Sequence, residues 1–211
     1  MKNKHRQDIA TKAALLFDQQ GYHQTTMEDI ADLMGIKKPT LYHYFKSKDE
    51  ILSLIHEVFV ELLLAKQKES KKSIISYEDL LRNTMRDIIG LMVTHRSHVR
   101  VFFEHHRELT EPFQSSIILK RDEYFELIES YIQSGIDDGK YKISDAKLGA
   151  LAMFGMCNWA YTWFDPNGRD SADSVGDHFW MWLTTGFIQG SEFEEMAVIG
   201  ETKQQMSNAK L

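Results

Sequence analysis

The sequence is short of the residues that cross-link or break a chain. Its 211 residues include one cysteine, Cys157, and three prolines. A single cysteine excludes an internal disulfide framework, and a reducing compartment is the simplest interpretation. Because proline interrupts helices, so few of them favour a mostly helical protein. With 43% hydrophobic residues, the chain has enough apolar material for a sizeable core in one or two domains.

Long hydrophobic runs are also missing. The basic start is followed by an apolar stretch that Lys12 and Asp18 interrupt, so we expect no signal peptide. The longest uncharged run, residues 148–164, is too short and too polar for a membrane span. No Gly-rich phosphate loop, nucleophile elbow or zinc-ligand spacing is present. We therefore expect a soluble cytoplasmic protein with no membrane partner, no catalytic or metal-binding residues and no cofactor.

Charge is unevenly distributed along the chain. Residues 1–50 carry eight Lys and Arg against seven Asp and Glu, a net charge of +1, so the remainder carries −7 of the total of −6. Within residues 35–48 there are four lysines and no acid. This compact basic segment is the part of a mildly acidic protein that can meet a polyanion.

Hydrophobic periodicity predicts helices nearly throughout. Ile9–Phe17 lie in a first helix that ends at Gly21, and Thr26 is the expected N-cap of a short helix that ends at Gly35. Pro39 suits the first turn of a second short helix. Ser47 and Glu50 have capping-box spacing at the start of a long helix that fades over residues 66–72. Further helices are expected over residues 77–95, 99–109, 112–136, 144–164 and 171–189.

The two short helices form a helix-turn-helix candidate, because a glycine turn joins them and the second helix is basic and aromatic. Lys38 and Thr40 are expected at its exposed N-terminal end, which meets base edges in a major groove. Leu41 and Phe45 would hold the helix on the core. The polar-tipped aromatic residues able to reach phosphates or base edges are Tyr42, His43 and Tyr44.

The segments Thr26-Met27-Glu28-Asp29-Ile30-Ala31 and Gly35–Leu52 resemble the DNA-binding signature of TetR-family transcriptional repressors, over about residues 8–55. Met34 stands where that family usually has alanine, and we expect only local repacking there. The resemblance implies a ligand-responsive repressor that binds a palindromic double-stranded DNA operator as a homodimer. It also implies phosphate contacts by Thr26, Tyr42 and Lys48, base contacts by Lys38, Pro39 and Thr40, and contacts to backbone or base edges by His43 and Tyr44.

The predicted fold class is therefore all-α. Residues 1–48 would form a three-helix DNA-binding domain with a helix-turn-helix. Residues 49–190 would form a helical bundle for ligand binding and dimerisation, and residues 191–211 a polar tail. The helices expected over 144–164 and 171–189 suit a hairpin that pairs with its twin in a four-helix bundle.

Aromatic residues are concentrated in the second half of the chain. They fit either a core and dimer interface or an apolar cavity for a small hydrophobic effector. Gly149, Ala152 and Gly155 leave room for a ligand or allow close helix packing. The candidate ligand-binding residues are Phe102, Phe103, Phe154, Trp159 and Trp163.

Two segments, Phe154–Trp159 and Trp163–Gly168, resemble TetR-type regulators of fatty-acid and sterol degradation that respond to acyl-CoA thioesters. The resemblance implies an acyl chain among the five aromatic residues just named. Basic groups would meet the CoA phosphates, with Arg96, Arg100, Arg107 and Arg121 as candidates. A regulator of drug efflux that senses lipophilic compounds is the alternative within the same family.

Two interpretations of another class remain. A helical enzyme or a metal site would use the cluster His95, His98, Glu104, His105, His106 and Glu108, although surface or pocket histidines fit that pattern better. A helical interaction module without DNA binding is disfavoured by the intact basic segment. Cys157 lies in an apolar helix, which indicates an inert buried thiol.

Overall fold

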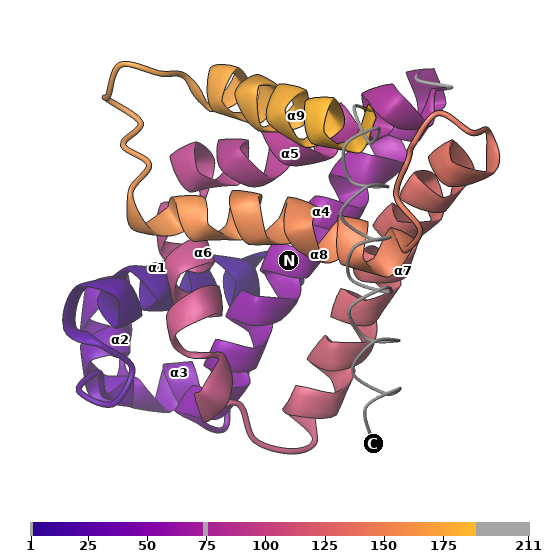
Figure 1. The fold of residues 1–211 in the computed structure, drawn as a ribbon. Coiled ribbons are helices and arrows are strands. Elements are labelled where there is room, and N and C mark those ends of the chain that lie inside the picture. The colour runs from indigo at the N-terminus through magenta and orange to yellow at the C-terminus, as the bar shows by residue number, and fades with distance from the viewer. Residues whose placement is uncertain (1, 74–75, 189–211) are drawn as a thin grey trace, which may run out of the picture.

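The computed structural model describes residues 2–73 and 76–188, and all regular structure in those ranges is helical (Figure 1), as the sequence predicts. The predicted tail, residues 191–211, lies outside the described residues. No described helix combines the length and apolar composition needed to cross a bilayer. In chain order the α-helices are α1 (Lys2–Gln20), α2 (Met27–Met34), α3 (Lys38–Tyr44), α4 (Lys48–Ser73), α5 (Tyr77–Thr94), α6 (Arg96–Glu104), α7 (Phe113–Asp137), α8 (Ala146–Trp159) and α9 (Ala172–Ile188).

The first three helices and the start of α4 enclose the smaller of two hydrophobic cores. Thr26 caps α2 in a full capping box with Asp29, and Gly35 ends this helix in the left-handed conformation with φ of 65°, which glycine adopts without strain. Both ends of α2 are therefore where the sequence predicts. The fully buried side chains of this smaller core include Phe17, Ile30, Leu41, Phe45 and Ile51.

Helix α4 is longer than the sequence suggests. The polar stretch 66–72, where we expected the helix to fade, remains helical to Ser73. Lys, Glu and Gln are good helix formers, and this stretch also packs on α5. Gln67 is buried and its amide donates to Thr84 Oγ1 at 2.8 Å, and Lys66 Nζ lies 2.8 Å from Asp87 Oδ1. Figure 1 shows α4 running from the helix-turn-helix into the other half of the molecule.

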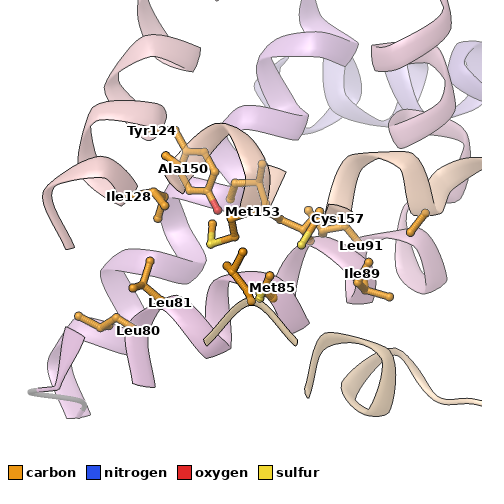
Figure 2. Packing of buried hydrophobic residues seen from close by; sticks show 14 of the residues in the cluster. Leu80, Leu81, Met85, Ile89, Leu91, Tyr124, Ile128, Ala150, Met153 and Cys157 are labelled. Carbon is orange, nitrogen blue, oxygen red and sulfur yellow. The ribbon is translucent and has the colours of Figure 1, made fainter. Parts of the chain in front are cut away.

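The larger core lies among α4, α5, α7, α8 and α9. Figure 2 shows part of it, where Met85 of α5, Tyr124 of α7, and Met153 and Cys157 of α8 come together. The helix expected over 144–164 is shorter than predicted. It begins after Asp145, whose carboxylate accepts from Leu148 N at 3.0 Å, and ends in the 3-10 turn Ala160–Thr162. This turn redirects the chain so that Phe164 returns to the core.

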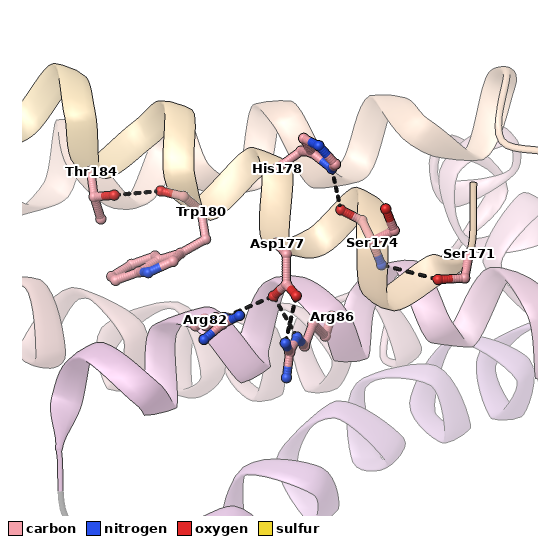
Figure 3. Close-up of polar contacts among 8 residues, drawn as sticks. All are labelled: Arg82, Arg86, Ser171, Ser174, Asp177, His178, Trp180 and Thr184. Carbon is pink, nitrogen blue, oxygen red and sulfur yellow. Dashed lines mark hydrogen bonds and ion pairs between the residues drawn. The ribbon is translucent and has the colours of Figure 1, made fainter. Parts of the chain in front are cut away.

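Helix α6 is also shorter than expected. It ends at Glu104, and the single 3-10 turn His106–Glu108 follows, in place of one helix over 99–109. Helix α9 packs along α5 and is held there by an ion-pair cluster (Figure 3). Asp177 accepts from Arg82 Nε at 2.8 Å and from both Nε and a terminal nitrogen of Arg86 at 2.6 Å. This bidentate geometry fixes the position of α9 on α5.

Candidate DNA-binding surface and effector cavity

Helix α3 has one buried and one exposed face. Leu41 and Phe45 are fully buried, so they hold the helix on the core as predicted. The opposite face is open to solvent and carries most of the expected DNA contacts, namely Lys38, Pro39, Thr40, Tyr42 and His43. Tyr44 is half-buried, since its ring lies 6.0 Å from that of His5 and its carbonyl accepts from Arg6. The exposed face has residue types that form hydrogen bonds to the base edges and phosphates of duplex DNA.

Three basic residues share this surface. Lys38 Nζ lies 3.3 Å from Glu28 Oε2 of α2, an ion pair between two exposed side chains that DNA can replace at little cost. Lys37 and Lys46 are also exposed. Both belong to the basic segment of residues 35–48, but neither was among the predicted DNA contacts. Their exposure on either side of α3 makes them candidates for phosphate contacts.

Two of the expected phosphate contacts are already engaged within the protein. Thr26 accepts from Asp29 N at 3.1 Å and donates to the Asp29 carboxylate at 2.8 Å. The ammonium group of Lys48 points at backbone carbonyls of the loop between α1 and α2. Neither side chain therefore points freely to solvent. Lys37 and Lys46 are exposed, and the ammonium group of Lys46 has one long contact, at 3.5 Å from Tyr42 O.

A cavity of about 530 Å³ lies in the second half of the molecule, within the range of small-molecule sites. Its wall is largely apolar and includes six aromatic side chains. The cavity is lined by Phe59, Val60 and Leu63 of α4, Ile88 of α5, Phe102 and Phe103 of α6, Arg121, Asp122, Tyr124, Phe125, Glu126 and Glu129 of α7, and Lys147, Leu151, Phe154 and Asn158 of α8.

Three of the five predicted ligand-binding residues, Phe102, Phe103 and Phe154, line this cavity. Trp159 and Trp163 do not, and the expectation that they would is wrong for this cavity. At about 100° per residue, Trp159 points some 140° away from Phe154 around α8, and it is 66% exposed. Trp163 follows the 3-10 turn and is 50% exposed.

The cavity face of α8 is a stripe of four residues, of which only Phe154 was predicted. Lys147, Leu151, Phe154 and Asn158 recur at helical spacing and all line the cavity. Phe59 of α4 was missed for a different reason. It belongs to the same apolar run as Leu62 and Leu63, and periodicity does not separate a cavity wall from a packed core.

Charged groups lie around the apolar wall. Of the four arginines suggested for CoA phosphates, Arg121 lines the cavity, joined by Lys147 from α8. Arg100 is instead paired with Asp18 at 3.0 Å and Glu104 at 3.1 Å, and Arg96 and Arg107 are not in the cavity wall. Three carboxylates on α7 share the rim, those of Asp122, Glu126 and Glu129.

Helix α6 joins the cavity to the DNA-binding core. The Phe102 ring lies 4.5 Å from that of Phe59 and 5.2 Å from that of His56, both on α4. The neighbouring Val101 is fully buried in the smaller core. Ser97 of the same helix donates to Asp18 of α1 at 2.9 Å. A displacement of α6 therefore acts on both α1 and α4.

The His and Glu cluster of residues 95–108 is spread over several environments. Burial lowers the pKa of His98 to about 4, whereas His106 is exposed and contacts its own turn at Phe103 O. Within the described ranges no three His, Cys, Asp or Glu side chains gather as a group able to hold a metal ion. Cys157 is buried and its pKa is raised to about 12 by burial, which makes its thiol unreactive.

Two family models match the two parts of the chain. The sequence model described as "Tetracyclin repressor-like, C-terminal domain" matches residues 75–187, and that of "Bacterial regulatory proteins, tetR family" matches residues 9–55. The protein is therefore a DNA-binding transcriptional regulator. It belongs to the TetR family, as a ligand-responsive repressor and not an enzyme.

Relatives and solved structures extend the comparison. The chain is 28% identical to the HTH-type regulator YhgD of Bacillus subtilis (strain 168), over 69% of this chain and 75% of the relative. It is 25% identical to the repressor KstR2 of Rhodococcus jostii (strain RHA1), over 84% of this chain and 88% of the relative. AibR, solved with isovaleryl coenzyme A and operator DNA, is 26% identical with a TM-score of 0.77, over 85% and 97% of the two chains.

Proposed function

We propose that this protein binds a near-palindromic operator as a homodimer and that an acyl-CoA thioester bound in the cavity releases it. The observation that carries the proposal is that α6 contributes to the cavity wall and to the DNA-binding core alike. Lys38, Pro39 and Thr40 would approach bases, and Lys37, Tyr42 and Lys46 would contact phosphates, with His43 and Tyr44 beside them.

Exposed apolar side chains on α8 and α9 support the homodimer. Trp159 is 66% exposed and Trp182 is 56% exposed, and Leu148 and Met181 are also exposed. Large apolar side chains gathered on two helices mark an interaction surface. Two copies of α3 in a two-fold dimer would read half-sites about 34–36 Å apart, or a multiple of that spacing.

The volume and the apolar lining of the cavity support an acyl-CoA. The aromatic wall would bury the acyl chain, and Arg121 and Lys147 at the rim would pair with phosphates of the head group. The similarity to AibR, whose structure contains isovaleryl coenzyme A, points to the same ligand class.

Release of DNA would follow from a preference of the ligand for one position of α6. An acyl chain between Phe102 and Phe154 displaces α6 against α4, whose first turn lies beside the helix-turn-helix. In a dimer this changes the separation of the two α3 helices, and the half-sites no longer fit.

The test is a titration of the operator complex, followed by fluorescence anisotropy, with acyl-CoAs of increasing chain length. The operator is first selected from random duplexes. Each added methylene should tighten binding about fourfold until the cavity is full, and CoA without an acyl group should not release DNA. If no acyl-CoA releases DNA or binds in calorimetry, the assignment of the effector fails.

A matched pair of variants tests the rim. Arg121→Ala with Lys147→Ala should weaken acyl-CoA binding about tenfold or more, because two charge-assisted contacts are lost. Arg169→Ala is the control, since Arg169 is 93% exposed and outside the cavity wall. Equal acyl-CoA affinity in both variants would contradict the role of the rim.

A lipophilic compound is the second candidate effector. The carboxylates of Asp122, Glu126 and Glu129 outnumber the two basic groups at the rim, which favours a neutral or cationic head group over a polyanion. Release of the operator by lipophilic amines, and not by acyl-CoAs, would select this alternative and with it a role in sensing drug-like compounds.

A further inference from the structure

The loop between α1 and α2, residues 21–26, converges on one lysine of another helix. Lys48 is the first residue of α4, and its Nζ lies 2.6 Å from Tyr22 O, 2.8 Å from Thr25 O and 3.4 Å from His23 O. An ammonium group has three donors and no acceptor, so every donor has a carbonyl of the same loop within reach. The Lys48 ammonium occupies the centre of this loop as a bound cation would.

Aromatic and acidic neighbours reinforce the contact. Lys48 Nζ also lies 4.3 Å from the centre of the Tyr22 ring, in cation–π geometry. The hydroxyl of Tyr22, a buried residue, donates to the carboxylate of Asp49, the next residue of α4. Two consecutive residues at the start of α4 therefore hold Tyr22 from its carbonyl, its ring face and its hydroxyl.

The loop determines where α2 begins. Thr25 is fully buried, and its hydroxyl donates to Gly21 O at 2.9 Å and accepts from Gln20 at 3.2 Å. The next residue, Thr26, is the N-cap of α2. Fixing the carbonyls of residues 22–25 relative to Lys48 thus fixes the first turn of α2 relative to the first turn of α4. Helix α3 follows α2 through the Gly35 turn and packs against it.

We propose that Lys48 is a positioning residue for DNA binding. Its ammonium holds the α1–α2 loop and thereby places α2 and α3 for the operator, and it does not donate to a DNA phosphate. This inference rests on the proposed binding of DNA through α2 and α3. It differs from the phosphate contact that the family resemblance implies for Lys48.

The dependence of affinity on salt separates the two roles. A lysine that contacts a phosphate contributes about 0.9 to the slope of log affinity against log salt, whereas a lysine held inside the protein contributes nothing. Lys48→Met keeps the apolar stem and removes the charge. We expect about a tenfold weaker operator complex with the wild-type salt slope.

A charge-conserving variant gives the second readout. An arginine serves a phosphate contact at least as well as a lysine, but its planar fork does not reproduce a compact ammonium among three carbonyls. Lys48→Arg should therefore weaken operator binding with the wild-type slope. Lys46→Met is the positive control for lost phosphate contacts and should lower the slope. Lys68→Met, an exposed lysine at the far end of α4, should change neither quantity.

Amide hydrogen exchange of the free protein provides a readout that does not require DNA. Lys48→Met and Lys48→Arg should speed exchange at the amides of residues 22–29 and leave α5–α8 protected as in the wild type. Faster exchange throughout, or unchanged exchange in the loop, contradicts the positioning role. The positioning role is also contradicted if Lys48→Arg binds the operator with wild-type affinity and Lys48→Met has a lowered salt slope. Failure of the wild-type protein to bind any selected duplex would instead overturn the proposed function.

Discussion

The two halves of this regulator use opposite kinds of packing. Around the helix-turn-helix the core is closed, and polar groups such as those of Thr26 and Lys48 are engaged by their own neighbours. The proposed DNA contacts of this half lie on its surface, on the exposed side of α3. The other half leaves a cavity of about 530 Å³ between α4, α6, α7 and α8, and exposes Trp159 and Trp182. The comparison teaches that a DNA-contacting helix needs a closely packed core beneath it. A ligand-binding half instead needs a cavity that its own side chains leave empty.

The largest effect should come from opening the closed core. Leu41 is fully buried in the smaller core, whereas Leu151 lines the cavity and is half-exposed. Leu41→Ala should lower the free energy of unfolding by about 2–5 kcal/mol, and Leu151→Ala by less than about 1 kcal/mol. Urea unfolding of both variants measures the difference. Similar losses for the two would show that the halves are packed alike.

A smaller effect is expected from two buried histidines, His98 of α6 and His56 of α4. Burial lowers the pKa of both His56 and His98 to about 4, against about 6.5 in the unfolded chain. Between these values the unfolded state binds more protons, so stability is complete above pH 6.5 and falls as the pH drops toward 4. At pH 5 each histidine should cost up to about 2 kcal/mol.

Substitution separates these histidines from other titrating groups. Unfolding of His98→Leu should depend less steeply on pH between 6.5 and 4 than unfolding of the wild type, and the same holds for His56→Leu. The exposed residue His178 is the control, and His178→Ala should keep the wild-type dependence. A wild-type protein equally stable at pH 7 and pH 5 would refute the prediction.

A still smaller effect is expected where α9 is clamped to α5. Hydrogen bonds from Arg86 and Arg82 hold the pKa of Asp177 well below its usual range. The stabilisation is therefore present above the ordinary carboxyl pKa of about 4 and is lost as the pH falls below it. Asp177→Asn should lose about 1 kcal/mol at pH 7, a surface-network value, and this deficit should shrink in acid. Asp170→Asn, in an exposed pair, should show no measurable deficit at either pH.

The DNA-binding half was largely predictable because its signals are local. The Thr26 cap, the Gly35 turn and the buried pair Leu41 and Phe45 depend on neighbours a few residues away, and each lies where the sequence places it. The engagement of Lys48 with residues 22–25 was not predictable, since it joins segments distant in sequence.

The cavity could be predicted only in part. The concentration of aromatic residues pointed to Phe102, Phe103 and Phe154, which line the cavity. Composition does not say which face of a helix a residue lies on, so it could not show that Trp159 and Trp163 lie outside this cavity wall. The polar stretch after Lys66 stayed helical for a similar reason. Its contacts with Thr84 and Asp87 come from α5, and no local signal reports them.

The smallest effects should come from alanine substitutions of two glycines of α8, one in a crowded position and one in an open position. A Cβ at Gly149 would lie 2.9 Å from Ile143 Cδ1 and 3.3 Å from Ile132 Cγ2, whereas a Cβ at Gly155 meets nothing within 4 Å. Gly149→Ala should therefore gain little or lose stability. Gly155→Ala should raise the stability of the isolated chain by up to about 1 kcal/mol through helix propensity. No described residue of the same chain therefore requires a glycine at position 155. The absence of a side chain there would instead allow a helix of a partner copy to approach closely. Sedimentation should then show a weaker dimer for Gly155→Ala and an unchanged one for Gly149→Ala, and the reverse pattern would place the dimer interface elsewhere.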